Sequence, residues 1–204
     1  MANTKIKICG IRRNEDAEYI NEVLPEFAGF VFWDKSKRNV SFEEAVELRR
    51  AIDKRIATVG VFVDPDPEFV RKLTDNGVIS YVQLHGKESE EYIRVLREMI
   101  GESVYIIKAY EVSDLDGVRQ ANMSGADMVL IDSGKGSGNT FDWSLLTEIN
   151  RDYFLAGGLS AENVKKAIEA LHPYAVDVSS KVETDGCKDR DKINEFCSEV
   201  RAAK

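Results

Sequence analysis

Eight short apolar runs, each followed by a segment with helical spacing, restrict the fold of this 204-residue chain more than any other feature. Strict alternation of strands and helices predicts a parallel sheet. Eight such units in one domain, over residues 1–204, favour a closed (β/α)8 TIM barrel; an open α/β sheet is the alternative. The strand-like runs lie at 5–10, 27–33, 57–64, 81–86, 104–110, 128–133, 153–158 and 174–180.

Helix boundaries can be predicted from capping residues between these runs. Ser41 and Glu44 have the spacing of a capping box. Ser89 and Gly101 bracket another helical segment as its start and stop. The segment 143–149 also has helical spacing and should lie between the sixth and seventh strands.

Composition excludes several classes of function. The formal net charge of −8 argues against general binding to a nucleic-acid backbone. No run approaches the length of a membrane span, and the first ten residues lack a signal-peptide core, so we expect no membrane partner and a cytoplasmic location. Three unevenly spaced cysteines and two histidines indicate neither a disulfide framework nor a metal site.

The first run, KIKICG, ends on a cysteine whose position suggests chemistry. Side chains alternate along a strand, so Ile6 and Ile8 should face the helices while Lys7 and Cys9 point into the barrel. Active sites of such barrels lie at the C-terminal ends of the strands, where Cys9 falls. A lone cysteine is otherwise most often a small buried hydrophobe, which is how we interpret Cys197.

Other strand ends place polar side chains at the same rim. Asp132 ends the sixth run, and His85 ends the fourth on the same face as Gln83. Asp177 and Ser179 share a face of the eighth. Asp132 could instead cap a helix, and His85 could be a structural histidine. Because unpaired buried charges are costly, we also predict that Lys7 on strand one pairs with Asp177 on the neighbouring strand eight.

Two glycine-rich loops and a Ser-Ser turn follow three consecutive strands and suggest a phosphate site. A backbone without side chains approaches an anion closely, and barrels often bind phosphate after strands seven and eight. Ser160 should cap the helix after strand seven. Such glycines could also serve only as tight turns. The candidate phosphate residues are Gly136, Gly138, Gly157, Gly158, Ser179 and Ser180.

The chain resembles the phosphoribosylanthranilate isomerase family in seven motifs that occur in the family's order, from about residue 5 to residue 192. These are KICGI, GFVFWDKSKRNVS, VGVFVD, VQLHG, LIDSGKGSGNTFDW, AGGLSAENV and VDVSSKVETDGCKD. The resemblance implies a cofactor-free and metal-free Amadori rearrangement of N-(5-phosphoribosyl)anthranilate in tryptophan biosynthesis. It also implies a small phosphorylated substrate as the partner.

The resemblance further implies roles for individual residues. Cys9 would be the general base, Asp132 the general acid, and Arg38 the residue that holds the anthranilate carboxylate. Two departures from the family pattern occur. The loop after Asp132 is short and has Asn139 where a lysine is common, and Trp33 with Asp34 replaces a common Tyr-Pro pair.

Two other functions compete with this one. Another phosphate-binding barrel isomerase or epimerase, including one that also accepts a histidine-pathway substrate, would share the fold but usually relies on paired aspartates or a metal. A non-catalytic sensor of phosphorylated ligands would not need the pair Cys9 and Asp132. The sequence leaves open whether the protein is a monomer or a homodimer.

Overall fold

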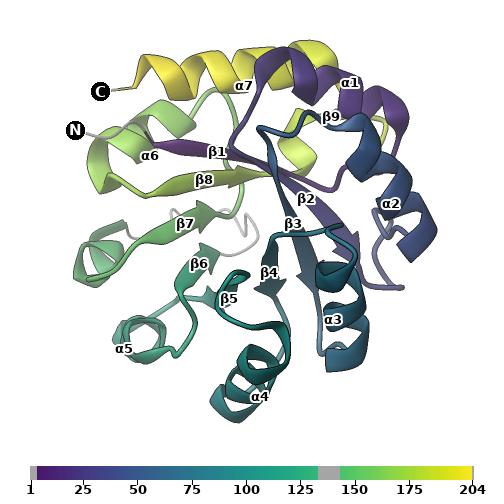
Figure 1. Cartoon of the computed structure of the whole chain (residues 1–204). Helices are drawn as coiled ribbons and strands as arrows, with labels where there is room; N and C mark the ends of the chain where they lie inside the picture. Colours follow the sequence, from purple (N-terminus) through teal and green to yellow (C-terminus); the bar gives the residue numbers. More distant parts are fainter. Residues whose placement is uncertain (1–3, 133–142, 204) are drawn as a thin grey trace.

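Eight parallel strands close into a barrel in the computed structural model, which describes residues 4–132 and 143–203 (Figure 1). Each strand pairs with the next, and β8 pairs with β1, so the predicted closed barrel is confirmed. The strands are β1 Lys5–Cys9, β2 Phe27–Phe32, β3 Ala57–Phe62, β4 Tyr81–Leu84, β5 Tyr105–Glu111, β6 Met128–Asp132, β7 Tyr153–Ala156 and β8 Ala175–Val178.

Helices surround this barrel on the outside (Figure 1). Ser41 and Glu44 form the predicted capping box of α2, and Ser89 and Gly101 cap the two ends of α4. The described α-helices are α1 Asn14–Val23, α2 Phe42–Ala51, α3 Pro67–Asp75, α4 Glu90–Ile100, α5 Leu115–Met123, α6 Val164–Leu171 and α7 Arg190–Ala202.

Two segments differ from the expectation of regular strand and helix alternation. Between β6 and β7 the described chain forms a 3₁₀ helix, η1 Trp143–Glu148, in place of a full α-helix. After β8 a second short 3₁₀ helix, η2 Ser180–Val182, leads into an antiparallel pair of two-residue strands, β9 Glu183–Thr184 and β10 Cys187–Lys188. These short elements follow directly after the C-terminal end of β8.

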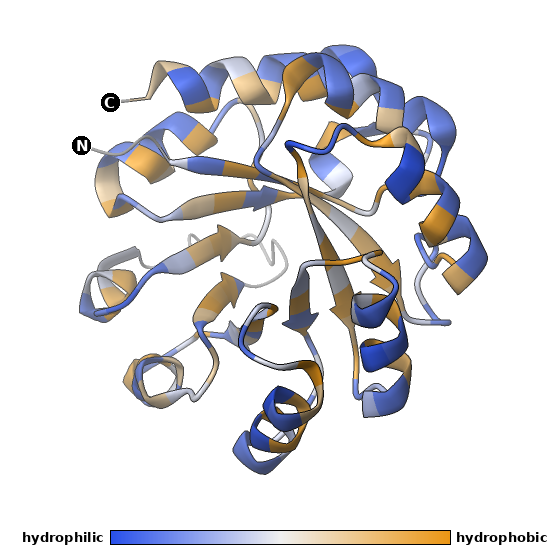
Figure 2. Cartoon of the chain, in the orientation of Figure 1, coloured by the Kyte–Doolittle hydropathy of each residue, from blue (hydrophilic) through white to orange (hydrophobic). Residues whose placement is uncertain are grey.

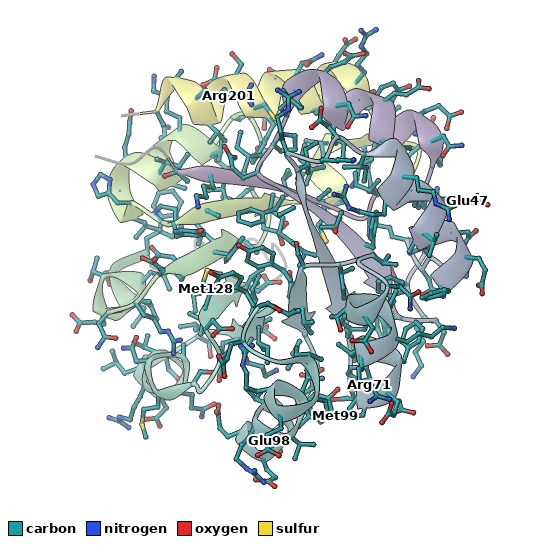
Figure 3. The ribbon with its side chains drawn as sticks, in the orientation of Figure 1. Glu47, Arg71, Glu98, Met99, Met128 and Arg201 are labelled. Carbon is teal, nitrogen blue, oxygen red and sulfur yellow. The ribbon has the colours of Figure 1, made fainter. Side chains whose placement is uncertain are left out.

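Apolar residues form two separate clusters, one between strands and helices and one inside the barrel. Ile6 and Ile8 belong to the outer cluster, whereas Cys9 belongs to the inner one, as the alternation predicted. Apolar stretches concentrate on the strands and on the helix faces turned toward them (Figure 2). Met128 of the inner cluster lies among the strands, whereas the side chain of Glu98 extends from an outer helix (Figure 3).

The inner cluster is closed at the N-terminal end of the strands by aromatic rings. Phe27 contacts Tyr81, Phe154 and Tyr174 with ring centroids 5.1, 5.2 and 6.5 Å away. This packing fills the barrel at that end, so an open pocket can form only toward the C-terminal ends of the strands. No helix within 4–132 or 143–203 is long and apolar enough to cross a membrane.

Candidate active site

A pocket of about 240 Å³ opens at the C-terminal ends of the strands. It brings together Cys9 from β1, His85 just after β4, Asp132 from β6 and Asp177 from β8, all of which were predicted to meet there. The remaining lining comes from the other strands and from the turns after β7 and β8: Val61, Gln83, Ala156, Gly157, Gly158, Leu159, Val178, Ser179, Ser180 and Lys181.

Cys9 reaches this pocket because its neighbours leave room for the sulfur. Gly29 on β2 is its register partner, and a Cβ at that position would lie only 2.9 Å from Cys9 Sγ. Gly10 has a φ of +85°, a left-handed conformation that favours glycine and turns the chain away immediately after the cysteine. The backbone carbonyl of Cys9 accepts a hydrogen bond of 3.2 Å from Ser179 Oγ, which ties the end of β1 to the turn after β8.

Lys7 and Asp177 form the buried ion pair that the sequence predicted. The two residues are in register across β1 and β8, and Lys7 Nζ lies 2.9 Å from Asp177 Oδ2. Burial alone would lower the pKa of Lys7, but the charges of Asp177 and Cys9 and the hydrogen bonds to both together outweigh it, so the pKa is raised and the ammonium is retained. Lys7 is fully buried, and therefore its charge acts inside the barrel with little screening by water.

The same environment acts on the thiol of Cys9. Burial raises its pKa, and the positive charge of Lys7 counteracts that rise only in part. The thiolate is the reactive form of a cysteine. A further positive charge close to the sulfur would therefore be needed to favour the thiolate near neutral pH.

His85 lies between two polar side chains of the pocket. Its Nδ1 is 3.0 Å from Gln83 Nε2, and its Nε2 is 3.8 Å from Asp132 Oδ2. Because an amide nitrogen only donates hydrogen bonds, Nδ1 must be the acceptor and the proton of the neutral ring resides on Nε2, facing Asp132. Burial lowers the pKa of His85 more than the nearby carboxylate of Asp132 raises it, which favours the neutral ring.

Arg38 lies at the same end of the barrel but is not among the residues that line the pocket. Its side chain passes over Gly10, where an added Cβ would collide with Arg38 Cδ. Its guanidinium binds Glu183 in a bidentate way, with Nε–Oε1 and Nη2–Oε2 distances both of 2.6 Å. Lys188 Nζ adds a third contact to Glu183, at 2.7 Å from Oε1. Neither Glu183 nor Lys188 was predicted as a site residue; Glu183 comes to Arg38 from 145 positions away, and Lys188 joins the site through its contact with Glu183.

The Gly-Gly turn after β7 has the backbone expected of a close approach to a ligand. Gly157 and Gly158 have φ values of +95° and +66° and line the pocket. The prediction that Ser160 caps the next helix is wrong, because α6 begins at Val164 and its N-cap residue is Asn163. The side chain of Asn163 instead ties the turn together, accepting from Ser160 N at 2.9 Å and donating to Gly158 O at 3.1 Å.

The other predicted phosphate residues divide into two groups. Ser179 and Ser180 line the pocket together with Lys181, a cation that was not predicted. Gly136 and Gly138 lie outside the described residues. In the parts of the chain that the structure describes, no group of three histidine, cysteine or acidic side chains is arranged to hold a metal ion.

Comparison with known proteins establishes the family of this chain. Residues 6–199 match the family model described as N-(5'phosphoribosyl)anthranilate (PRA) isomerase. The chain belongs to the phosphoribosylanthranilate isomerase family. This enzyme family of tryptophan biosynthesis includes curated relatives named N-(5'-phosphoribosyl)anthranilate isomerase. The relative from Clostridium acetobutylicum is 45% identical over 210 residues, covering 98% of this chain and 99% of the relative. That from Acetivibrio thermocellus is 42% identical over 212 residues, with 98% and 97% covered.

Solved structures of phosphoribosylanthranilate isomerases share the fold over almost the whole chain. The enzyme from Thermotoga maritima has a TM-score of 0.88 at 38% identity, with 97% of this chain and 98% of that chain covered. Another structure of this family, in complex with reduced 1-(o-carboxyphenylamino)-1-deoxyribulose 5-phosphate, has a TM-score of 0.86 at 37% identity and the same coverage. The predicted family and barrel architecture are thus confirmed, and the protein is an isomerase.

Proposed function

We propose that this protein converts N-(5-phosphoribosyl)anthranilate to 1-(2-carboxyphenylamino)-1-deoxyribulose 5-phosphate, with Cys9 as general base and Asp132 as general acid. The observation that carries the proposal is that a thiol on β1 and a carboxyl group on β6 line one pocket that also contains a Gly-Gly turn and a cation, Lys181. A sugar phosphate held between them would be exposed to an acid on one side and a base on the other.

The first step requires an acid. Asp132 donates a proton to the furanose oxygen as the bond between that oxygen and C1′ breaks. The electron pair of the aryl amine forms a protonated Schiff base at C1′. About a third of the Asp132 side chain is exposed, so water can return a proton to it between turnovers. The neutral His85 ring, with its Nε2 proton facing Asp132, stabilises the carboxylate that this step produces.

The second step requires a base. The positive nitrogen of the Schiff base makes the hydrogen on C2′ acidic, and Cys9 removes it to give an enolamine, which tautomerises to the ketone. Lys7 alone does not fully counteract the effect of burial on the pKa of Cys9. The positively charged Schiff base adds a second charge that lowers this pKa. The thiolate is thus favoured at the stage at which it is needed, although burial raises the pKa of the free thiol.

The two anionic ends of the substrate fit different parts of the rim. The phosphate binds at the turns after β7 and β8, with Gly157, Gly158, Ser179 and Ser180, and with Gly136 and Gly138 outside the described residues. Arg38 binds the anthranilate carboxylate through its planar guanidinium, and this carboxylate competes with Glu183 for it. We place the protein in the cytoplasm as a monomer or a homodimer.

A fluorescence assay that follows the loss of phosphoribosylanthranilate tests this proposal. Cys9→Ala and Asp132→Ala should each lower kcat by about 10²- to 10⁴-fold, whereas Arg38→Ala should mostly raise KM. Cys187→Ala is the matched control, because this free cysteine does not line the pocket and its loss should leave kcat unchanged. A Cys9→Ala enzyme within a few-fold of the parent, or a parent that cannot support growth of an isomerase-deficient tryptophan auxotroph, would refute the assignment.

A further inference from the structure

Two residues that line the pocket carry buried oxygen atoms without a hydrogen-bond partner. Across the described part of the chain, the buried side-chain atoms in this condition are Gln83 Oε1 and Asp177 Oδ1. Gln83 is 1% exposed, and the side chain of Asp177 is 9% exposed. Buried polar atoms are nearly always hydrogen-bonded, so two exceptions in the same pocket point to donors that a ligand supplies.

Each of these side chains is held in place by its other polar atom. Asp177 Oδ2 accepts from Lys7 Nζ at 2.9 Å, which leaves Oδ1 available. Gln83 donates from Nε2 to His85 Nδ1 at 3.0 Å, which leaves Oε1 available. Neither side chain can turn to satisfy its second oxygen without losing the first contact. The two acceptors are therefore fixed before any ligand binds, which reduces the entropy lost on binding.

The chemistry of the two atoms restricts what they can bind. An amide oxygen and a carboxylate oxygen only accept hydrogen bonds, so they repel phosphate and carboxylate groups and favour hydroxyl or N–H donors. Gln83 is on β4 and Asp177 is on β8, which are four strands apart in a closed ring of eight. Both side chains line the same pocket, so a ligand that carries two hydroxyl donors can supply a partner to each acceptor.

We propose that Gln83 Oε1 and Asp177 Oδ1 accept hydrogen bonds from the C2′ and C3′ hydroxyls of the ribose. This inference rests on the proposed function and adds to it a specificity-determining residue, Gln83, that the family resemblance did not identify. The two contacts orient the ring between Cys9 and Asp132, while the phosphate and the anthranilate carboxylate are directed to the cationic and glycine-rich parts of the rim.

Two substrates that differ by one hydroxyl test the proposal. Anthranilate is condensed with ribose 5-phosphate or with 3-deoxyribose 5-phosphate, and kcat/KM is measured for each product. The parent enzyme should favour the ribosyl substrate by about 10-fold if the amide accepts the C3′ hydroxyl, and by up to about 100-fold if the carboxylate does. A parent that converts both substrates within twofold of each other would overturn the proposal. A parent that converts neither would instead refute the proposed function.

Two substitutions then assign the acceptors. Gln83→Met has nearly the same shape and no acceptor oxygen. In Asp177→Asn the amide oxygen must face Lys7, because an ammonium group only donates, so an NH₂ group replaces the acceptor in the pocket. The substitution that removes the acceptor of the C3′ hydroxyl should bring the two kcat/KM values within twofold. The other should lower both values by about 10-fold or more and preserve their ratio.

Gln83→Met alone is decisive even if Asp177→Asn does not fold. It must either abolish discrimination or lower kcat/KM for both substrates, and Gln83→Glu, which keeps an acceptor oxygen, must recover part of the loss. Gln83→Met within twofold of the parent on the ribosyl substrate refutes the proposal. The control is Val82→Ala, which shortens the buried neighbour of Gln83 on β4 that packs in the outer cluster and does not line the pocket, and it should leave the ratio of the two substrates unchanged. A changed ratio in this control would count against hydrogen bonding as the cause.

Discussion

Replacing Glu183 with glutamine should destabilise the fold at neutral pH, because this carboxylate holds two cations beside the active site. Its oxygens accept from Arg38 at 2.6 Å twice and from Lys188 at 2.7 Å. The side chains of Glu183 and Lys188 are 6% and 1% exposed. In Glu183→Gln a single neutral amide oxygen replaces the carboxylate that accepts from both cations. The ammonium of Lys188, which also donates to Ser179 O at 2.9 Å, then faces Arg38 as a like charge without the anion that binds both.

The magnitude follows from the pKa of Glu183. Burial would raise it, but the hydrogen bonds from Arg38 and Lys188 outweigh burial and lower it from 4.5 to about 2. At about 1.4 kcal/mol per pKa unit, this difference corresponds to an upper limit of about 3.5 kcal/mol of folding free energy. Arg38 is 28% exposed, and solvent screens part of its contribution, so we expect a loss of about 2 kcal/mol. For a chain of this size that lowers Tm by about 4–8 °C.

The pH dependence provides a second, independent test. A carboxylate whose pKa is lowered on folding contributes its full stabilisation above the unfolded value and loses it as the pH falls toward the folded value. The difference in unfolding free energy between parent and Glu183→Gln should therefore be constant above about pH 5.5 and smaller by about 1 kcal/mol at pH 3.5. Urea denaturation of both proteins at several pH values measures it.

A matched control separates burial from pairing. Glu91 on α4 binds Arg94 in the same bidentate manner, at 2.6 and 3.0 Å, but both side chains are more than half exposed. Glu91→Gln should have little effect on stability at any pH. The reasoning fails if Glu183→Gln is as stable as the parent at pH 7, if the difference does not shrink on acidification, or if Glu91→Gln costs as much.

Three further outcomes are expected at the β1 end of the site. Gly29→Ala should lower kcat at least 10-fold and destabilise the barrel by about 1–3 kcal/mol, because the new Cβ would lie 2.9 Å from Cys9 Sγ and 3.1 Å from its Cα. Steady-state kinetics measures the first effect and urea denaturation the second. Lys7→Met should cost about 3–5 kcal/mol because it leaves Asp177 buried without its cation; a loss below 1 kcal/mol contradicts this. Lys7→Met should also slow alkylation of Cys9 by iodoacetamide at pH 8, since Lys7 lowers the pKa of that thiol. Cys197 is the internal control, because burial raises its pKa to about 12 and it should resist alkylation in parent and variant until the chain unfolds.

The local pattern of the sequence was sufficient to predict the barrel architecture and which side chains of the first strand share a face. Alternation along residues 5–9 determines that Lys7 and Cys9 share a face, because successive side chains of any strand point in opposite directions. The capping residues Ser41 and Ser89 likewise depend only on neighbours within a helical turn. Strand and helix alternation then favours a parallel barrel without reference to any distant contact.

Tertiary structure alone decided the contacts that depend on how distant segments meet. Arg38 and Glu183 are 145 positions apart, and no pattern within either segment indicates that a two-stranded hairpin after β8 brings them together. The sequence also does not predict that Gln83 Oε1 lacks a hydrogen-bond donor, because that depends on which atoms of other strands lie within reach of it. The direction in which each side chain points is set within a single strand. Which polar atoms find hydrogen-bond partners depends instead on how all eight strands close into the barrel.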